Sequence, residues 1–200
     1  MKDYTCIIPW SGGVESTSLM CHAIEQGEKP YAFHLIFNGH WKQQVTAVKA
    51  MSEELGVPVH FVRIDMPHPY TNPNKIKDYY ANWGNTAPMY INWMNIAQII
   101  HFHNPFITKI WSGRNLNESD IIRSKEVRAA QRSIEMLADV QGIPVKVSCP
   151  LENLTKEEQF NMIPDEVRRH IATCVAIDNH GRPCGKCKKC HEFKEMLKKV

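Results

Sequence analysis

The sequence has little that would place the protein in a membrane or on a nucleic acid. It contains no apolar run of about 18 residues, the length that a membrane-spanning helix needs. Its first ten residues, MKDYTCIIPW, lack the apolar stretch of a secretion signal and the composition of a transit peptide. Charges nearly balance, with 24 Lys and Arg against 21 Asp and Glu, and a net charge of +3 does not indicate a nucleic-acid binder. We therefore expect a cytoplasmic protein without a membrane partner.

The sequence also lacks the G-x-x-x-x-G-K-[ST] loop of Walker-type nucleotide-binding proteins. It has instead a glycine-rich junction, Pro9–Met20 (PWSGGVESTSLM), between an apolar run and a helical pattern. Gly12 and Gly13 allow a sharp turn and a close approach of the backbone to a ligand. The helix that begins near Glu15 offers N–H groups and a positive dipole end to an anion. The junction predicts a phosphate site; an ordinary strand–helix turn with a serine cap is the alternative.

Seven cysteines are an odd number for a disulfide framework. Four of them follow the pattern C-x9-C-x2-C-x2-C near the C-terminus: Cys174, Cys184, Cys187 and Cys190. This spacing is typical of a knuckle in which four thiolates enclose a tetrahedral zinc, and a closed shell predicts one structural zinc per chain. Unrelated reduced cysteines are the alternative. Cys6, Cys21 and Cys149 lie in apolar surroundings, and we interpret them as core residues rather than nucleophiles.

Short apolar runs alternate with longer segments of helical period along most of the chain. We expect strands at 4–9, 31–37, 59–64, 106–111 and 145–148, and helices at 15–26, 42–55 and 88–101. This alternation predicts an α/β fold, a doubly wound five-stranded parallel sheet with helices on both faces. Ligands bind such sheets beyond the carboxyl ends of the strands, where the strand order reverses. The glycine-rich junction follows the first strand, which commonly lies at that place.

Three motifs carry a resemblance to a known family. Ser11–Thr17 (SGGVEST) resembles the S-G-G-x-D-S-[TS] pyrophosphate loop (PP-loop) of the N-type ATP pyrophosphatases. Trp111–Asn115 (WSGRN) resembles a fourth-strand end with I-G-x-N, and Ser148–Glu158 (SCPLENLTKEE) resembles T-P-L-x-x-L-[ST]-K-x-E, where Thr155 and Glu158 also fit a helix capping box. Together with the cysteine pattern, these motifs make nearly the whole chain similar to the 7-cyano-7-deazaguanine synthase family of queuosine biosynthesis.

That resemblance implies an adenine nucleotide alpha hydrolase-like fold with a C-terminal zinc knuckle. We expect residues 1–165 to form the ATP pyrophosphatase domain and residues 166–200 a zinc-binding segment packed on it. The implied activity is that of an ATP-dependent ligase that forms a C–N bond. It adenylates 7-carboxy-7-deazaguanine, lets ammonia displace AMP to give an amide, and repeats the activation to give the nitrile. The implied partners are ATP with Mg²⁺, ammonia and the carboxylated 7-deazaguanine, and a homodimer is compatible with the resemblance.

The resemblance also implies roles for single residues. The implied catalytic residues are Ser11, Glu15, Ser16, Asp120 and Arg128. The implied nucleotide-binding residues are Ser11, Gly12, Gly13, Val14, Glu15, Ser16, Thr17, Phe37, Asn38, Gly113 and Asn115. Glu15 stands where the family usually has aspartate, which keeps the carboxylate and lengthens its reach. For Arg128, a solvated helix face is the alternative interpretation.

Departures from the family pattern fall on the substrate side. Ala87–Asn92 (APMYIN) lacks the family's arginine, Asn38–Trp41 (NGHW) replaces a Tyr-Gly-Gln turn, and Asp120–Arg123 (DIIR) replaces Asp-Tyr-Ser-Gly. The sequence therefore supports adenylation better than it supports the deazaguanine substrate. Three alternatives stay open: a reaction that stops at the amide or uses another carboxylate, an RNA-modifying ATP pyrophosphatase, and an idle nucleotide-binding module. We expect no nucleic-acid partner, because the C-terminal lysines fit a solvated helix.

Overall fold

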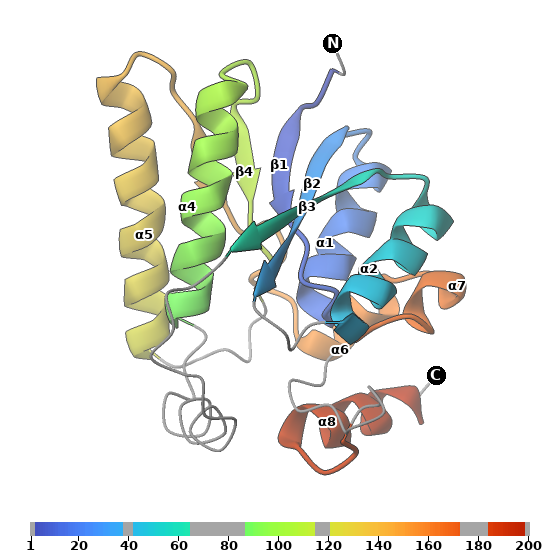
Figure 1. Cartoon of the computed structure of the whole chain (residues 1–200). Helices are drawn as coiled ribbons and strands as arrows, with labels where there is room; N and C mark the ends of the chain where they lie inside the picture. The colour runs from blue at the N-terminus through green and yellow to red at the C-terminus, as the bar shows by residue number, and fades with distance from the viewer. Residues whose placement is uncertain (1–2, 38–41, 65–86, 115–120, 173–183, 199–200) are drawn as a thin grey trace.

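A parallel β-sheet forms the centre of the molecule. The computed structural model describes residues 3–37, 42–64, 87–114, 121–172 and 184–198 (Figure 1). Within them lie five strands: β1 (Cys6–Pro9), β2 (Pro30–Phe37), β3 (Val59–Ile64), β4 (Lys109–Trp111) and β5 (Lys146–Ser148). Their order is β3-β2-β1-β4-β5, and every neighbouring pair is parallel. The predicted doubly wound five-stranded sheet is confirmed.

Helices cover both faces of this sheet. Those of the described residues are α1 (Val14–Glu25), α2 (Lys42–Leu55), α4 (Ala87–His103), α5 (Ile121–Val140), α6 (Lys156–Asn161), α7 (Asp165–Arg168) and α8 (Lys188–Leu197). Figure 1 shows α1 and α2 on one face and α4 and α5 on the other. It also shows α8 beyond the end of the sheet toward which the strands point. Among the described residues, no helix is both long and apolar enough to cross a bilayer.

Two apolar cores flank the sheet because successive residues of a strand point to opposite faces. Ile8 is fully buried among Leu19, Met51 and other side chains on the α1 and α2 face. Its neighbour Ile7 is fully buried on the other face, in the core that contains Trp93 of α4. Both faces of β1 are therefore covered, which explains why the strand reads as a continuous apolar run rather than an alternating one.

One predicted strand boundary is wrong in an informative way. The strand expected from Phe106 begins at Lys109. Residues 104–107 form a turn in which the Ile107 N–H donates to the Asn104 carbonyl at 3.0 Å, and the Phe106 side chain is 51% exposed. The apolar residue at the start of the expected strand thus belongs to the preceding turn, a distinction that hydrophobicity alone does not make.

Candidate nucleotide site and cysteine cluster

The glycine-rich junction lies where the strand order of the sheet reverses. β1 pairs with β2 on one side and with β4 on the other, so the chain runs outward in both directions from this point. Residues 11–13 leave the carboxyl end of β1, and Gly13 is the N-cap of α1. The predicted placement of the junction is confirmed. The first turn of α1 directs its N–H groups and positive dipole end to the place where such sheets bind ligands.

Gly12 gives the loop its shape. Its φ of +86° lies in the left-handed region, which side-chain-bearing residues rarely adopt, and an added Cβ would lie 3.0 Å from Cγ2 of Val48. The Gly12 carbonyl accepts a hydrogen bond from the Ala172 N–H at 3.0 Å. The loop is thus held against both α2 and the segment that leads to the C-terminal cysteines.

Two serine hydroxyls brace the same loop from within. Ser16 Oγ accepts a hydrogen bond from the Ser11 N–H at 3.1 Å and lies 2.9 Å from Ser11 Oγ. Ser11 Oγ accepts from the Gly13 N–H at 3.4 Å. These contacts connect the end of β1 to the first turn of α1, so the backbone N–H groups are oriented before any ligand arrives.

The Thr17 and Val14 side chains lie under the loop and point into the core. Thr17 is fully buried, and its Oγ1 accepts a hydrogen bond from the Trp10 indole N–H at 3.1 Å and donates to Sδ of Met51 at 3.7 Å. Its own N–H donates to the Gly13 carbonyl at 3.0 Å. Val14 is also fully buried. Thr17 and Val14, which the resemblance gives as nucleotide-binding residues, therefore support the loop by packing in the core.

We expect Thr17→Val to lower stability while leaving nucleotide affinity close to that of the wild type. Valine has a similar shape but leaves the buried Trp10 N–H without its acceptor, which costs about 1–3 kcal/mol. Thermal unfolding and titration with an ATP analogue would measure the two effects. Thr17→Ser keeps the hydroxyl and is the control. A large loss of affinity with unchanged stability would instead assign the hydroxyl to the ligand.

Gly113 brings the end of β4 against the first turn of α1. A Cβ at this position would lie 2.7 Å from the carbonyl carbon and oxygen of Glu15 and 2.9 Å from the Ser16 nitrogen. Contacts this short do not occur between real Cβ atoms and backbone. Gly113 was assigned to the nucleotide by resemblance, and the structure shows the close backbone packing that requires glycine there.

Lys156 is a residue next to the loop that sequence analysis missed. It is the first residue of α6, whose start is fixed by the predicted capping box: the Glu158 N–H donates to Thr155 Oγ1 at 3.2 Å, and the Thr155 N–H donates to the Glu158 carboxylate at 2.7 Å. Lys156 Nζ lies 3.1 Å from Glu15 Oε1 and 3.6 Å from Glu192 Oε2. The sequence signal was present in the L-T-K-x-E motif, where only the capping pattern was interpreted.

The pKa of Lys156 reflects these neighbours. Burial of the side chain lowers the pKa, but the Glu15 and Glu192 carboxylates raise it more, so that it lies above its ordinary value. Lys156 is therefore a fixed positive charge beside the Ser11–Thr17 loop. Its side chain is 18% exposed, so solvent screens its ion pairs less than those of a surface lysine.

Gln159 holds α6 to the ends of the strands. This fully buried side chain donates from Nε2 to the Leu151 carbonyl at 2.8 Å and to the Arg114 carbonyl, and its Oε1 accepts from Ser18 Oγ at 3.4 Å. One amide thus joins α1, the segment after β4 and the segment after β5. No sequence pattern singled it out, because its partners are far away along the chain.

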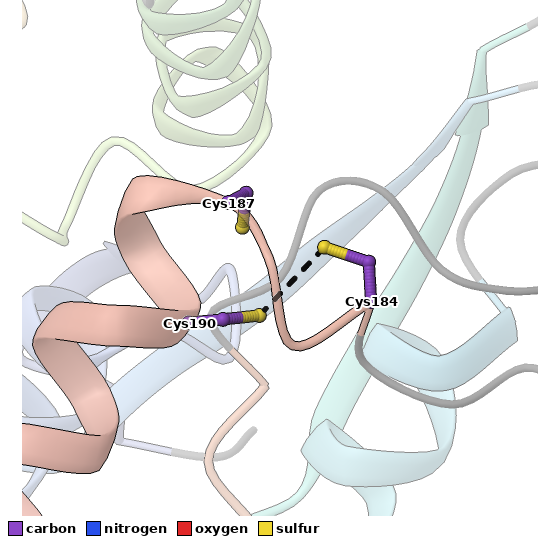
Figure 2. Close-up of side chains that lie close together, drawn as sticks. All are labelled: Cys184, Cys187 and Cys190. Carbon is purple, nitrogen blue, oxygen red and sulfur yellow. Dashed lines mark hydrogen bonds between the residues drawn. The ribbon is translucent and has the colours of Figure 1, made fainter.

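Three of the four predicted zinc ligands come together at the start of α8. The Sγ atoms of Cys184, Cys187 and Cys190 all lie within 4.8 Å of one another, and those of Cys184 and Cys190 are 4.0 Å apart. Figure 2 shows these sulfur atoms turned toward one another. Two thiolates on one tetrahedral zinc, with bonds of about 2.3 Å, are separated by about 3.8 Å. The cluster therefore fits a metal such as zinc.

The remaining cysteines of the described residues are buried thiols outside the cluster. Cys6, Cys21 and Cys149 are buried and form no disulfide, as their interpretation as core residues required. Burial raises the pKa of the Cys6 and Cys21 thiols to about 12, and it raises the pKa of Cys149 above its usual range. A thiol that does not ionise at neutral pH is a poor nucleophile and a poor metal ligand.

Comparisons with known proteins point to one family. No protein-family model matches the chain. A 7-cyano-7-deazaguanine synthase from Pseudomonas putida (strain W619) is 22% identical over 210 residues, which cover 95% of this chain and 92% of that protein. The enzyme of the same name from Saccharophagus degradans is 24% identical over 213 residues, covering 95% and 91%. The chain is a distant, full-length homologue of the 7-cyano-7-deazaguanine synthases.

Two solved structures were also found to be similar. The NMN synthetase from Francisella tularensis has a TM-score of 0.49 at 12% identity and covers 96% of this chain and 74% of its own. The U34-tRNA thiolase NcsA from Methanococcus maripaludis has a TM-score of 0.47 at 12% identity, and the match covers 100% of this chain and 67% of that protein.

Several residues that the 7-cyano-7-deazaguanine synthase resemblance singled out have no described side chain. Asn38, Asn115, Asp120 and Cys174 lie outside the described residues, and Phe37 ends β2 without a described side chain. Arg128 is exposed on α5 and lines a pocket beside the end of β5 with Ser148 and Cys149. Of the catalytic candidates, Ser11, Glu15 and Ser16 come together at the loop.

Proposed function

We propose that the protein is an ATP-dependent ligase that activates a carboxylate by adenylation and then forms a C–N bond. The observation that carries this proposal is the braced Ser11–Thr17 loop, set at the carboxyl end of β1 against the N-terminus of α1. Homology to 7-cyano-7-deazaguanine synthases supports ATP as the cosubstrate. Our proposed substrates are 7-carboxy-7-deazaguanine and ammonia, and our proposed product is the nitrile, formed by way of the amide.

The chemistry explains why such a reaction needs this loop. A carboxylate resists ammonia because it carries negative charge and has no good leaving group. Its oxygen attacks the α-phosphorus of ATP, the bond to the β-phosphate oxygen breaks, and pyrophosphate leaves. Ammonia then attacks the acyl carbon and AMP departs, which gives the amide. A second ATP then adenylates the amide oxygen and releases pyrophosphate, and loss of AMP together with the two N–H protons gives the nitrile.

In this proposal the loop receives the charge that develops on the departing pyrophosphate. Backbone N–H groups of Gly12, Gly13 and the first turn of α1 bind its oxygens, and the positive end of α1 stabilises the charge. Mg²⁺ bound with ATP would neutralise phosphate charge, and Glu15, in the first turn of α1, would be the residue that offers it a carboxylate oxygen. Asn115, Asp120 and Arg128 remain our candidates for contacts to the substrate or to the metal.

A labelling experiment tests the proposal. The protein is incubated with ATP, Mg²⁺, ¹⁵N-ammonium and 7-carboxy-7-deazaguanine, and mass spectrometry follows the base, AMP and pyrophosphate. We expect AMP and pyrophosphate to form only with the carboxylated base, which gains ¹⁵N as amide, nitrile or both. Ser11→Ala is expected to slow turnover roughly ten- to hundredfold, because a slightly misplaced loop loses its alignment with the phosphates.

The matched control is Ser133→Ala, which removes an exposed hydroxyl of α5 that donates to the Ala129 carbonyl of the same helix at 2.9 Å. It is expected to retain full activity. Two results would contradict the proposal. ATP cleavage that requires RNA, with no labelled base, would favour an RNA-modifying enzyme. Binding of ATP without any cleavage would favour an idle nucleotide-binding module.

A further inference from the structure

The segment that carries the cysteine cluster is joined to the nucleotide loop on both sides of the cysteines, directly upstream and through Lys156 downstream. Upstream of the cysteines, the buried Ala172 donates its N–H to the Gly12 carbonyl at 3.0 Å. Downstream, Glu192 of α8 lies 3.6 Å from Lys156 Nζ, which lies 3.1 Å from the Glu15 carboxylate. Two structural contacts, one through the backbone and one through side chains, thus join the two motifs that the sequence shows as separate.

Helix α8 positions Glu192 through the cysteines. Cys187 is the N-cap of α8 and Cys190 is buried in its first turn, so a metal at the cluster fixes the start of this helix. Glu192 follows Cys190 by two residues. The next residue is Phe193, whose ring packs edge-on against Phe160 of α6, with ring centroids 5.7 Å apart. Metal binding and this aromatic contact therefore set the distance between Glu192 and Lys156.

Lys156 is placed to transmit that position to the loop. Its side chain and that of Glu15 are 18% and 21% exposed, and Glu192 is 39% exposed. A cation this sheltered depends on its partners, because few water molecules replace a lost carboxylate. When Glu192 is in place it shares the ammonium with Glu15 and restrains its direction. Without Glu192, the ammonium would lose one of the two carboxylates that restrain its direction beside the first turn of α1.

We propose that the cysteine cluster and the nucleotide site are energetically coupled through Glu192, Lys156 and Glu15, with Lys156 as the positioning residue. Metal at the cluster keeps Lys156 and Glu15 in the arrangement that receives the nucleotide. This inference rests on the proposed function only in taking ATP as the ligand. Coupling between two sites is reciprocal, so bound nucleotide strengthens metal binding by the same factor by which metal strengthens nucleotide binding.

A binding cycle on the full chain tests the coupling. The affinity for an ATP analogue with a non-cleavable α,β-methylene link is measured with zinc bound and after zinc removal by a chelator, for the wild type and Glu192→Gln. We expect zinc removal to weaken binding by the wild type about 5- to 50-fold, within the usual range of allosteric coupling. Zinc-loaded Glu192→Gln is expected to lose a similar factor, and removing its zinc to add little. Bound analogue should slow zinc release from the wild type but not from the variant.

Controls separate this route from general damage. Glu195→Gln alters the same helix at a residue paired with Lys198 at 2.6 Å, and it should bind metal and nucleotide as the wild type does. Lys156→Arg should retain the zinc effect and Lys156→Met should lose it. Equal effects of zinc removal in the wild type and Glu192→Gln, or unchanged affinity in zinc-loaded Glu192→Gln, would overturn the coupling alone. Failure of the wild type to bind the analogue at all would overturn the proposed function as well.

Discussion

Gly113→Ala is expected to lower the affinity for an ATP analogue about a hundredfold. The added Cβ would lie 2.7 Å from the carbonyl carbon and oxygen of Glu15 and 2.9 Å from the Ser16 nitrogen. These are backbone atoms, so no side-chain rotation relieves the contact, and either the first turn of α1 or the end of β4 must move. Overpacking of this kind costs about 1–3 kcal/mol of stability. A misplacement of roughly 1 Å costs an enzyme about a hundredfold in rate, and we expect a loss of the same order in binding, because the N–H groups of the first turn of α1 shift with it.

Gly13→Ala is the matched control for the stability part of this result. A Cβ at Gly13 would meet only the Glu15 carboxylate at 3.5 Å and Ser11 Oγ at 3.6 Å, which are ordinary contacts, and its φ of −82° suits any residue. Thermal unfolding should therefore show a clear loss of stability for Gly113→Ala and little change for Gly13→Ala. Wild-type affinity in Gly113→Ala would mean that the end of β4 yields and that the loop does not depend on this contact.

Periodicity predicted the architecture because it reports burial directly. β1 lies in the middle of the sheet with both faces covered, and it reads as an unbroken apolar run. The helices on either side read with helical period. The position of the glycine-rich loop then followed from a general property of doubly wound sheets, without knowledge of any side-chain direction.

Side-chain direction is what the motif could not supply. Ser16 and Thr17 are neighbours in the resemblance, yet Ser16 bonds within the loop and Thr17 bonds to Trp10 in the core. The two side chains point in different directions because consecutive residues of a helix are about 100° apart around its axis. Gly113 likewise matched a binding motif, but the contact that explains it is with the backbone of a helix about a hundred residues earlier in the chain.

Contacts between distant segments were missed for the same reason. Gln159 meets Ser18 across a sequence separation of 141 residues, and Lys156 meets Glu15 across a similar distance along the chain. Each looks like an ordinary polar residue of a short helix when the sequence is read locally. Only the packing of α6 on α1 turns them into parts of the loop's surroundings. A lysine and a glutamate that pair at such a separation produce no periodic pattern in the sequence.

Cys190→Ser is expected to reduce the zinc content of the purified protein from about one per chain to nearly none. Cys190 is the buried member of the cluster, 5% exposed, and its Sγ lies 4.0 Å from that of Cys184. A serine hydroxyl does not ionise at neutral pH and cannot replace a thiolate on zinc. Because structural zinc sites contribute about 10–16 kcal/mol of apparent binding free energy, loss of one ligand removes most of the metal's hold on the segment.

The consequences should be largest around α8 and smaller in the sheet. Met196 of α8 is buried in the core that also contains Phe160, so release of α8 exposes apolar surface and lowers the unfolding temperature. Elemental analysis and limited proteolysis would measure the two effects. Cys149→Ser is the matched control: Cys149 is also buried, accepts a hydrogen bond from Gln131 Nε2 at 3.1 Å, and lies outside the cluster, so its variant should keep the zinc. Equal zinc contents in wild type and Cys190→Ser would show that the cysteines do not hold the metal, since a site built from these thiolates cannot lose its buried member and stay full.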